Sequence, residues 1–146
     1  MNTISQIPVI AIDGPSASGK GTVAQLVAQK LGFHYLDSGA LYRLVALKSM
    51  HSRIDIDDTA ALTDIARNLN VTFDHDEISL DDSIVTNDIR TEKCGILASK
   101  LAAYPQIRAA LTDRQRKFCQ PPGLVTDGRD MGSVIFPDAI LKIFLT

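Results

Sequence analysis

The chain has 146 residues, of which 45% are hydrophobic and 22% are charged, as in an ordinary globular domain. Its formal net charge of −2 excludes a basic field over the whole chain that would serve nucleic acid. We find neither a signal-peptide pattern nor a run of about 18 apolar residues, and therefore expect no membrane partner. Cys94 and Cys119 lack metal-ligand spacing, which favours a reduced cytoplasmic setting.

A strand, a glycine-rich loop, a helix and a second strand are predicted at the start of the chain. Residues 7–12 are almost continuously apolar, which is typical of a buried parallel strand. Apolar residues then recur at helical spacing: Val23, Leu26, Val27 and Leu31. Gly32 is placed to end that helix, and residues 33–36 form the next strand. This βαβ order predicts an α/β fold with a parallel sheet and helices on both faces.

The residue pattern in the middle of the chain predicts an insert that is not part of the parallel sheet. Asp37 or Ser38 can begin a helix through residue 50, whose apolar residues are Leu41, Leu44, Val45 and Leu47. Another helix is predicted over residues 58–69. Three short apolar stretches separated by Asp-rich turns then predict a small antiparallel meander, at residues 71–73, 78–80 and 84–86. We assign residues 38–120, approximately, to this insert.

Helices over residues 92–103 and 105–119 and strands over 124–126 and 139–145 complete the prediction. A parallel strand needs helices on both faces of its sheet. Either the earlier helices cover the strand at 139–145, or the sequence is part of a longer protein. We expect the second.

The segment from Gly14 to Thr22 has the spacing G-x-x-x-x-G-K of a phosphate-binding loop between a strand and a helix. Glycines let successive amides point at phosphate oxygens, the helix N-terminus adds partial positive charge, and Lys20 adds a full one. Gly21 stands where the strict pattern has Ser or Thr. The residues expected to bind ATP are Gly14, Pro15, Ser16, Ala17, Ser18, Gly19, Lys20, Gly21 and Thr22.

Three further segments, with this loop, resemble the bacterial cytidylate kinases, which are P-loop nucleoside monophosphate kinases. They are LDSGALYR at residues 36–43, LAAYPQIR at 101–108 and DGRDMGSVIFPDA at 127–139. The resemblance covers essentially the whole chain. It implies phosphoryl transfer from ATP to CMP and dCMP with magnesium. We expect the protein to be cytoplasmic and monomeric. The resemblance also implies that the meander belongs to the monophosphate-binding insert.

The resemblance implies specific roles for the site residues. Lys20, Asp127 and Arg129 would be catalytic, and seven residues would bind the monophosphate: Ser38, Tyr42, Arg43, Ser99, Arg108, Arg129 and Asp130. Asp130 could accept a hydrogen bond from the exocyclic amine of cytosine, which uracil lacks. Magnesium would have no direct protein ligand, and Thr22 or Asp127 would act through water. Without the resemblance, Ser38 can also be read as a helix cap, and Asp13 as a residue that shapes the loop or belongs to the site.

The family continues beyond the matched segments into an arginine-bearing lid and a last strand, both of which the sequence lacks. Such arginines are worth on the order of 10³ or more in rate in related phosphoryl transfer, so we expect this chain alone to be inactive. Many relatives carry glycine where this chain has Ala17. Two alternatives remain: another P-loop kinase of small molecules or nucleotides, and a nucleotide-binding fragment without catalysis.

Overall fold

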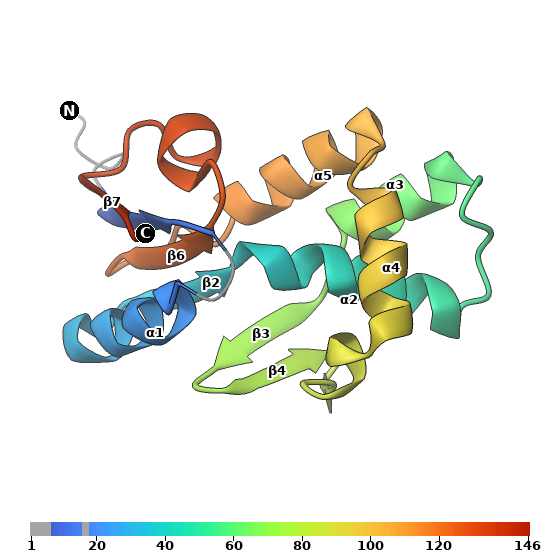
Figure 1. The fold of residues 1–146 in the computed structure, drawn as a ribbon, viewed down its shortest axis with the longest axis horizontal. Helices are drawn as coiled ribbons and strands as arrows, with labels where there is room; N and C mark the ends of the chain where they lie inside the picture. The colour runs from blue at the N-terminus through green and yellow to red at the C-terminus, as the bar shows by residue number, and fades with distance from the viewer. Residues whose placement is uncertain (1–6, 16–17) are drawn as a thin grey trace. The chain divides into compact units, whose positions relative to one another are not determined.

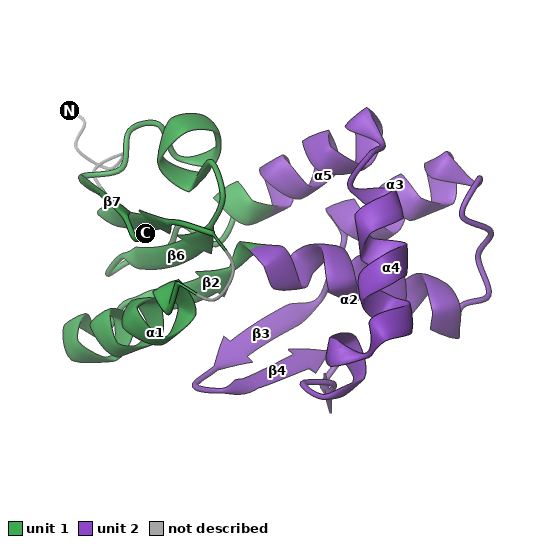
Figure 2. Ribbon diagram, viewed as in Figure 1, with its two compact units in different colours: residues 1–38, 115–146 green, residues 39–114 purple. Residues whose placement is uncertain are grey.

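The computed structural model describes residues 7–15 and 18–146. Its chain divides into two units, drawn in separate colours in Figure 2. Unit 1 comprises residues 1–38 and 115–146, and unit 2 comprises residues 39–114. The predicted site residues Ser16 and Ala17 lie outside the described residues.

Unit 1 is built on a parallel sheet of four strands in the order β2-β6-β1-β7 (Figure 1). The strands are β1 (Val9–Asp13), β2 (His34–Asp37), β6 (Leu124–Gly128) and β7 (Leu141–Phe144). All three strand pairs are parallel, which confirms the predicted α/β class. Because the strands run in one direction, their carboxyl ends meet at one edge, where Asp13 is opposite Gly128 and Asp37 is opposite Asp127.

Helix α1 (Lys20–Leu31) packs against this sheet through alanines rather than through its large apolar residues. Ala24 and Ala28 join a core cluster with three sheet residues, Ile10, Ile12 and Val125. Three of the four apolar residues that recur at helical spacing do not form the buried face: Val23, Leu26 and Leu31 are 38%, 53% and 49% exposed. Alanine has a small side chain, so a helix that presents alanines to a sheet can pack close to it.

The end of α1 is as predicted. Gly32 has φ 70°, and its amide donates to the carbonyls of Ala28 and Gln29. Glycine adopts this left-handed conformation without steric cost, so it stops the helix and turns the chain into β2.

Four helices contribute to unit 2: α2 (Ser38–His51), α3 (Thr59–Arg67), α4 (Glu92–Leu101) and α5 (Pro105–Arg116). Asp58 caps α3 by accepting from the Ala61 amide at 3.1 Å, and Thr91 caps α4 by accepting from the Cys94 amide at 3.2 Å. The four apolar residues that the sequence analysis named on α2 are at most 5% exposed: Leu41, Leu44, Val45 and Leu47. In the described ranges, no helix has the length and apolar character that crossing a membrane requires.

The Asp-rich stretch of unit 2 forms the predicted antiparallel meander, with β3 (Val71–Asp74), β4 (Glu77–Leu80) and β5 (Ser83–Ile84) in that order. Asp81 and Asp82, between β4 and β5, have φ values of 51° and 68°. Aspartate is one of the few residues other than glycine that tolerates this region, which explains its use in the turn.

Two short helical turns were not predicted, η2 (Asp88–Arg90) and η3 (Met131–Ile135). η3 begins after the two residues that follow β6 and is a five-residue π-helical turn, in which the Phe136 amide donates to the Met131 carbonyl at 2.7 Å. Neither turn is long enough to produce a periodic pattern in the sequence.

Thr126, in the middle of β6, is fully buried, and its hydroxyl has no hydrogen-bond partner within the described part of the chain. A buried hydroxyl without a partner costs about 1–3 kcal/mol. We therefore expect Thr126→Val, which keeps the shape of the side chain, to raise the free energy of unfolding by about 1 kcal/mol. Urea unfolding measures this change, with Thr72→Val at an exposed position of strand β3 as the matched control. A less stable T126V variant would show that the hydroxyl has a partner in solution.

Candidate functional site

The loop between β1 and α1 brings Lys20 to the carboxyl edge of the sheet in unit 1. Gly19 has φ 84° and is the N-cap of α1, a conformation that side chains rarely adopt. A Cβ atom on Gly14 would lie 2.5 Å from the backbone oxygen of Leu145, so only glycine fits there. The Nζ atom of Lys20 lies 3.3 Å from the Pro15 carbonyl oxygen, to which it donates across the loop. The positions of Gly14, Gly19 and Lys20 thus fit a phosphate-binding loop that opens a helix.

The hydroxyls of this segment differ in their surroundings. Thr22 is exposed on the first turn of α1. The Ser18 Oγ atom is buried and has no hydrogen-bond partner among the described residues. An orphaned buried hydroxyl beside a phosphate-binding loop is one that a bound phosphate oxygen could satisfy.

A buried carboxylate lies next to the first turn of α1. Asp127, the fourth residue of β6, is 4% exposed and accepts a hydrogen bond from the Tyr35 hydroxyl. A Cβ atom on Gly21 would be 3.9 Å from both the Asp127 Oδ2 atom and the Tyr35 oxygen. The first turn of α1 therefore lies beside this pair, and a Cβ atom at position 21 would make only an ordinary van der Waals contact with it.

The electrostatic environment of this pair differs from that of a surface carboxylate. Burial, and then the negative charge of Asp37, raise the pKa of Asp127 to about 6, although the Tyr35 hydrogen bond and the charge of Lys20 act to lower it. Burial and the charges of Asp37 and Asp127 likewise raise the pKa of Tyr35. The burial of Asp127 and the nearby charge of Asp37 therefore favour the binding of a cation at this carboxylate.

Arg129 and Asp130 follow immediately after β6, and both side chains are exposed. Asp130 has φ 60° and ψ 25°, in the left-handed region, and η3 begins at the next residue. The Gly14 amide donates to the Gly128 carbonyl at 3.3 Å. The phosphate-binding loop and the Arg129–Asp130 segment thus start from hydrogen-bonded neighbours at the ends of adjacent strands.

Ser38, which was predicted to contact the monophosphate, is buried in unit 1. Its hydroxyl donates to the Gln115 Oε1 atom at 2.7 Å, and the two residues are 8% and 2% exposed. A hydroxyl that donates once still has acceptor lone pairs. Gln115 was not singled out in the sequence, because nothing local marks a residue that pairs with a position 77 residues away.

In unit 2 the Arg43 guanidinium is held between α2 and α4. Its Nη1 atom donates to the Ile89 carbonyl at 2.8 Å, while a Cβ atom on Gly95 would be 3.1 Å from both Nη atoms. The Cys94 thiol donates to the Arg43 backbone carbonyl at 3.1 Å. Arg43 is thus half-buried and oriented by its neighbours, rather than a freely solvated surface charge.

The remaining predicted substrate residues, Ser99 and Arg108, are exposed in unit 2. Ser99 Oγ donates to the Gly95 carbonyl at 3.1 Å, one turn back along α4. Arg108 Nη1 donates to the Ala102 carbonyl at 3.0 Å. Burial raises the pKa of Tyr42, and the positive charge of Arg108 acts to lower it. Unit 2 therefore places Arg108 near Tyr42. It also places Ser99 one helical turn from Gly95, which lies against the Arg43 guanidinium.

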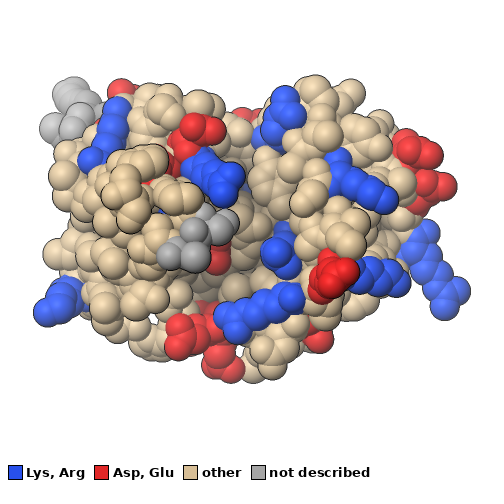
Figure 3. Space-filling view, viewed as in Figure 1, with Lys and Arg blue, Asp and Glu red and all other residues tan. Residues whose placement is uncertain are grey.

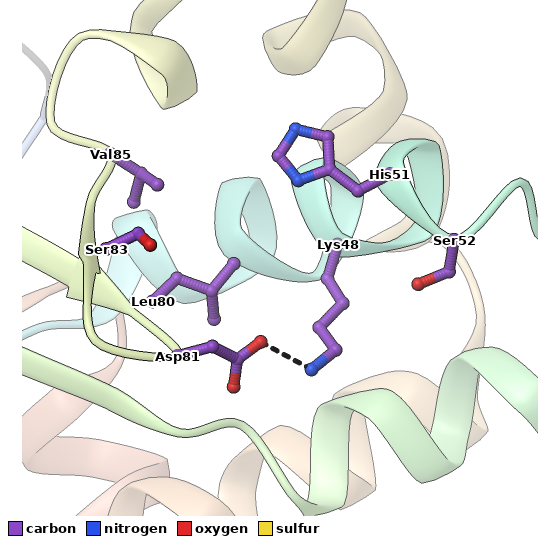
Figure 4. Close-up of a pocket in the computed structure, with 7 residues that line it drawn as sticks. All are labelled: Lys48, His51, Ser52, Leu80, Asp81, Ser83 and Val85. Atoms are coloured by element: carbon purple, nitrogen blue, oxygen red, sulfur yellow. Dashed lines mark hydrogen bonds and ion pairs between the residues drawn. The ribbon is translucent and has the colours of Figure 1, made fainter.

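Basic and acidic side chains are interspersed on the face shown in Figure 3, in keeping with the small net charge. Unit 2 also has a pocket of about 330 Å³, between the end of α2 and the meander (Figure 4). Its lining residues are Lys48, His51, Ser52, Leu80, Asp81, Ser83 and Val85, none of which is a predicted site residue. Lys48 and Asp81 form an ion pair at 2.6 Å, so the lysine charge is already neutralised and gives the pocket no preference for an anion.

A parallel sheet with a glycine-rich loop between its first strand and helix, and a carboxylate at the end of a neighbouring strand, defines a P-loop protein of the α/β class. The sequence model of the cytidylate kinase family matches residues 10–146. The chain therefore belongs to the cytidylate kinase family.

Curated relatives carry the same family name. A cytidylate kinase of Polynucleobacter asymbioticus is 62% identical over 98% of this chain and 65% of its own length. Those of Nitrosomonas europaea and Chromobacterium violaceum are 60% and 61% identical over 96% of this chain and 63% of their own lengths. The chain thus spans slightly less than two thirds of the length of the relatives that it matches.

Proposed function

We propose that the protein transfers the γ-phosphoryl group of ATP to CMP and dCMP, giving ADP and CDP or dCDP. One observation carries this proposal: β1 and β6 end side by side, joined by the hydrogen bond from Gly14 to Gly128. A donor loop that binds phosphate and a segment with an arginine and an aspartate therefore leave the sheet at the same place. Relatives named cytidylate kinase, about 60% identical, support the choice of substrate.

The donor would be held by the loop amides and by Lys20. The acceptor phosphate would be held by Arg43, Arg108 and Arg129, because one guanidinium group can donate two parallel hydrogen bonds to a phosphate. An oxygen of the acceptor phosphate attacks the γ-phosphorus, and the bond to the oxygen that bridges to the β-phosphate breaks. The attacking oxygen of the acceptor phosphate is already anionic, so the reaction depends on positioning and charge neutralisation more than on a general base.

Asp130 and Ser99 would read the base. A carboxylate accepts from the exocyclic amine of cytosine, and uracil presents no donor there. The residues 39–114 of unit 2 would then serve as the monophosphate-binding insert. The cytoplasmic location, the monomeric state and the absence of a nucleic-acid partner accompany this assignment as predictions.

Asp127 fits the magnesium ion that the family implies. Within the described ranges, no group of three or more His, Cys, Asp and Glu side chains could hold a metal by itself. Magnesium is commonly bound by one or two carboxylates together with substrate phosphates and water. Asp127, with Asp37 opposite it on β2, would hold such an ion through water, where it would neutralise charge on the β- and γ-phosphates.

Nucleotide titration tests the base assignment. We expect this chain to bind CMP more tightly than UMP or AMP in isothermal titration calorimetry. We expect Asp130→Ala to reduce the affinity for CMP about tenfold or more and to change that for UMP little, because the exocyclic amine of cytosine loses its charged acceptor and uracil has no such amine. Asp138→Ala, at an exposed position of the same unit, is the matched control. Tighter binding of UMP or AMP than of CMP would refute the assignment.

An assay coupled to ADP formation, with ATP and each monophosphate, tests the reaction itself. Turnover of a different monophosphate or of another small molecule would instead favour a different P-loop kinase. Binding of nucleotide without turnover, in this chain and in any longer form of the protein, would favour a non-catalytic nucleotide-binding role.

A further inference from the structure

The carboxylate of Asp13, at the end of β1, binds two consecutive backbone amides of a distant segment. Its Oδ1 atom accepts from the Met131 amide at 2.7 Å, and its Oδ2 atom accepts from the Gly132 amide at 3.0 Å. The partners are 118 and 119 residues away along the chain. The sequence left the role of Asp13 open, and these contacts show that its side chain holds the turn that follows β6.

These two hydrogen bonds complete the anchoring of Asp130. The first amides of a helical turn have no partner inside the turn. Here the amides of Met131 and Gly132 find theirs on Asp13. On the other side, the Asp130 carbonyl accepts from the amides of Val134 and Ile135 at 2.9 and 3.2 Å. The left-handed backbone of Asp130 is thus fixed both by its own carbonyl and by the two amides that follow it.

Asp13 is also tied to the sheet and to the start of the phosphate-binding loop. Its carbonyl accepts from the Leu145 amide at 2.8 Å, and the next residue, Gly14, donates to Gly128 at 3.3 Å. The side chain therefore reaches from a strand end that has backbone hydrogen bonds of its own.

We propose that Asp13 is a positioning residue for base recognition: it fixes the backbone of residues 130–132 and with it the directions of Arg129 and Asp130. This inference rests on the proposed function, in which these two side chains bind the monophosphate. Asp13 does not contact substrate in this role. It acts through the segment that does.

The chemistry of the anchor requires a carboxylate. Both of its oxygens accept, one from each amide. An asparagine offers one acceptor, and its NH₂ group would face the second amide donor. Asp13→Asn therefore breaks one of the two hydrogen bonds with almost no change in volume, and Asp138→Asn makes the same chemical change at an exposed position of unit 1.

Two measurements on this chain test the inference separately from the proposed function. The first is hydrogen exchange by NMR. In the wild type we expect the Met131 and Gly132 amides to exchange roughly 100-fold more slowly than unprotected amides, and in D13N to lose most of that protection. The second is calorimetric titration with CMP, UMP and ATP. We expect D13N to lower the ratio of CMP to UMP affinity about tenfold and to change ATP affinity less than about threefold, whereas D138N changes neither.

The outcomes distinguish the two hypotheses. If the Met131 and Gly132 amides exchange freely in the wild type, the proposed anchor is wrong. This test needs no variant, so the inference can be refuted even if D13N does not fold. A D13N protein of lower thermal stability but with an unchanged CMP-to-UMP ratio would show a merely structural role and would also overturn it. A wild type without preference for CMP would instead refute the proposed function, and the exchange data would still report on the anchor.

Discussion

Replacing Lys20 by methionine is expected to weaken ATP binding by at least about tenfold and to slow phosphoryl transfer by about 10³-fold or more. The reason is charge. Lys20 opens α1 with its Nζ atom over the loop, 3.3 Å from the Pro15 carbonyl, and it is near enough to act on the pKa of Asp127. Methionine keeps the length of the side chain and removes the only full positive charge that the loop itself contributes.

Lys30→Met is the matched control, because Lys30 lies in the last turn of the same helix and is exposed. Calorimetry with ATP gives the affinity, and an assay coupled to ADP formation gives the rate in whichever form of the protein turns over. If K20M retained ATP affinity within about threefold of K30M, Lys20 would not bind the phosphates, and the assignment of this loop as the donor site would be wrong.

The local elements of the fold could be predicted because each has a short-range cause. A continuous apolar run predicted β1, the glycine at position 32 predicted the end of α1, and Asp-rich turns predicted the meander. The buried face of α1 could not be predicted, because Ala24 and Ala28 pack into the core although larger apolar residues of the same helix are exposed. The hydrophobicity of single residues does not indicate which face of a helix meets the sheet.

The candidate site was predicted residue by residue, whereas the partners of those residues were not. Asp127 follows from its place at a strand end, but its hydrogen bond to Tyr35 joins residues 92 positions apart. The same holds for Ser38 with Gln115 and for Asp13 with η3. Such pairs arise when the fold brings distant segments of the chain together, and no local pattern in one sequence records them.

Asp127→Asn is expected to abolish a decrease in stability that the wild type shows between about pH 4 and pH 7. The pKa of Asp127 is raised from 3.8 to about 6 in the folded protein, so the folded state binds more protons than the unfolded state in this range. The stabilisation of the protonated form is therefore complete below about pH 4 and is lost as the pH rises through 6. The change in pKa corresponds to about 3 kcal/mol of unfolding free energy.

Urea unfolding at pH 4 to 8, in buffer without magnesium or nucleotide, measures this dependence. We expect D127N and the wild type to be similarly stable at pH 4, and D127N to be more stable by about 3 kcal/mol, as an upper value, at pH 8. The asparagine side chain of D127N stays neutral over this range and can still accept from Tyr35. Asp138→Asn provides the control for an exposed carboxylate. Equal pH dependence in D127N and the wild type would show that burial does not raise the pKa of Asp127.

Tyr35→Phe separates the hydrogen bond from burial as a cause. The Tyr35 hydroxyl stabilises the charged form of Asp127, so its removal is expected to raise the pKa of Asp127 above about 6, which the ¹³C shift of the carboxyl carbon would report. The stability of Y35F should then begin to fall at the same pH as that of the wild type, near the unfolded-state pKa, but should continue to fall to a higher pH. A lower pKa in Y35F would mean that Tyr35 keeps water from Asp127 more than it stabilises the charge. In that case the readiness of this carboxylate to bind a cation would come from burial and from Asp37 alone.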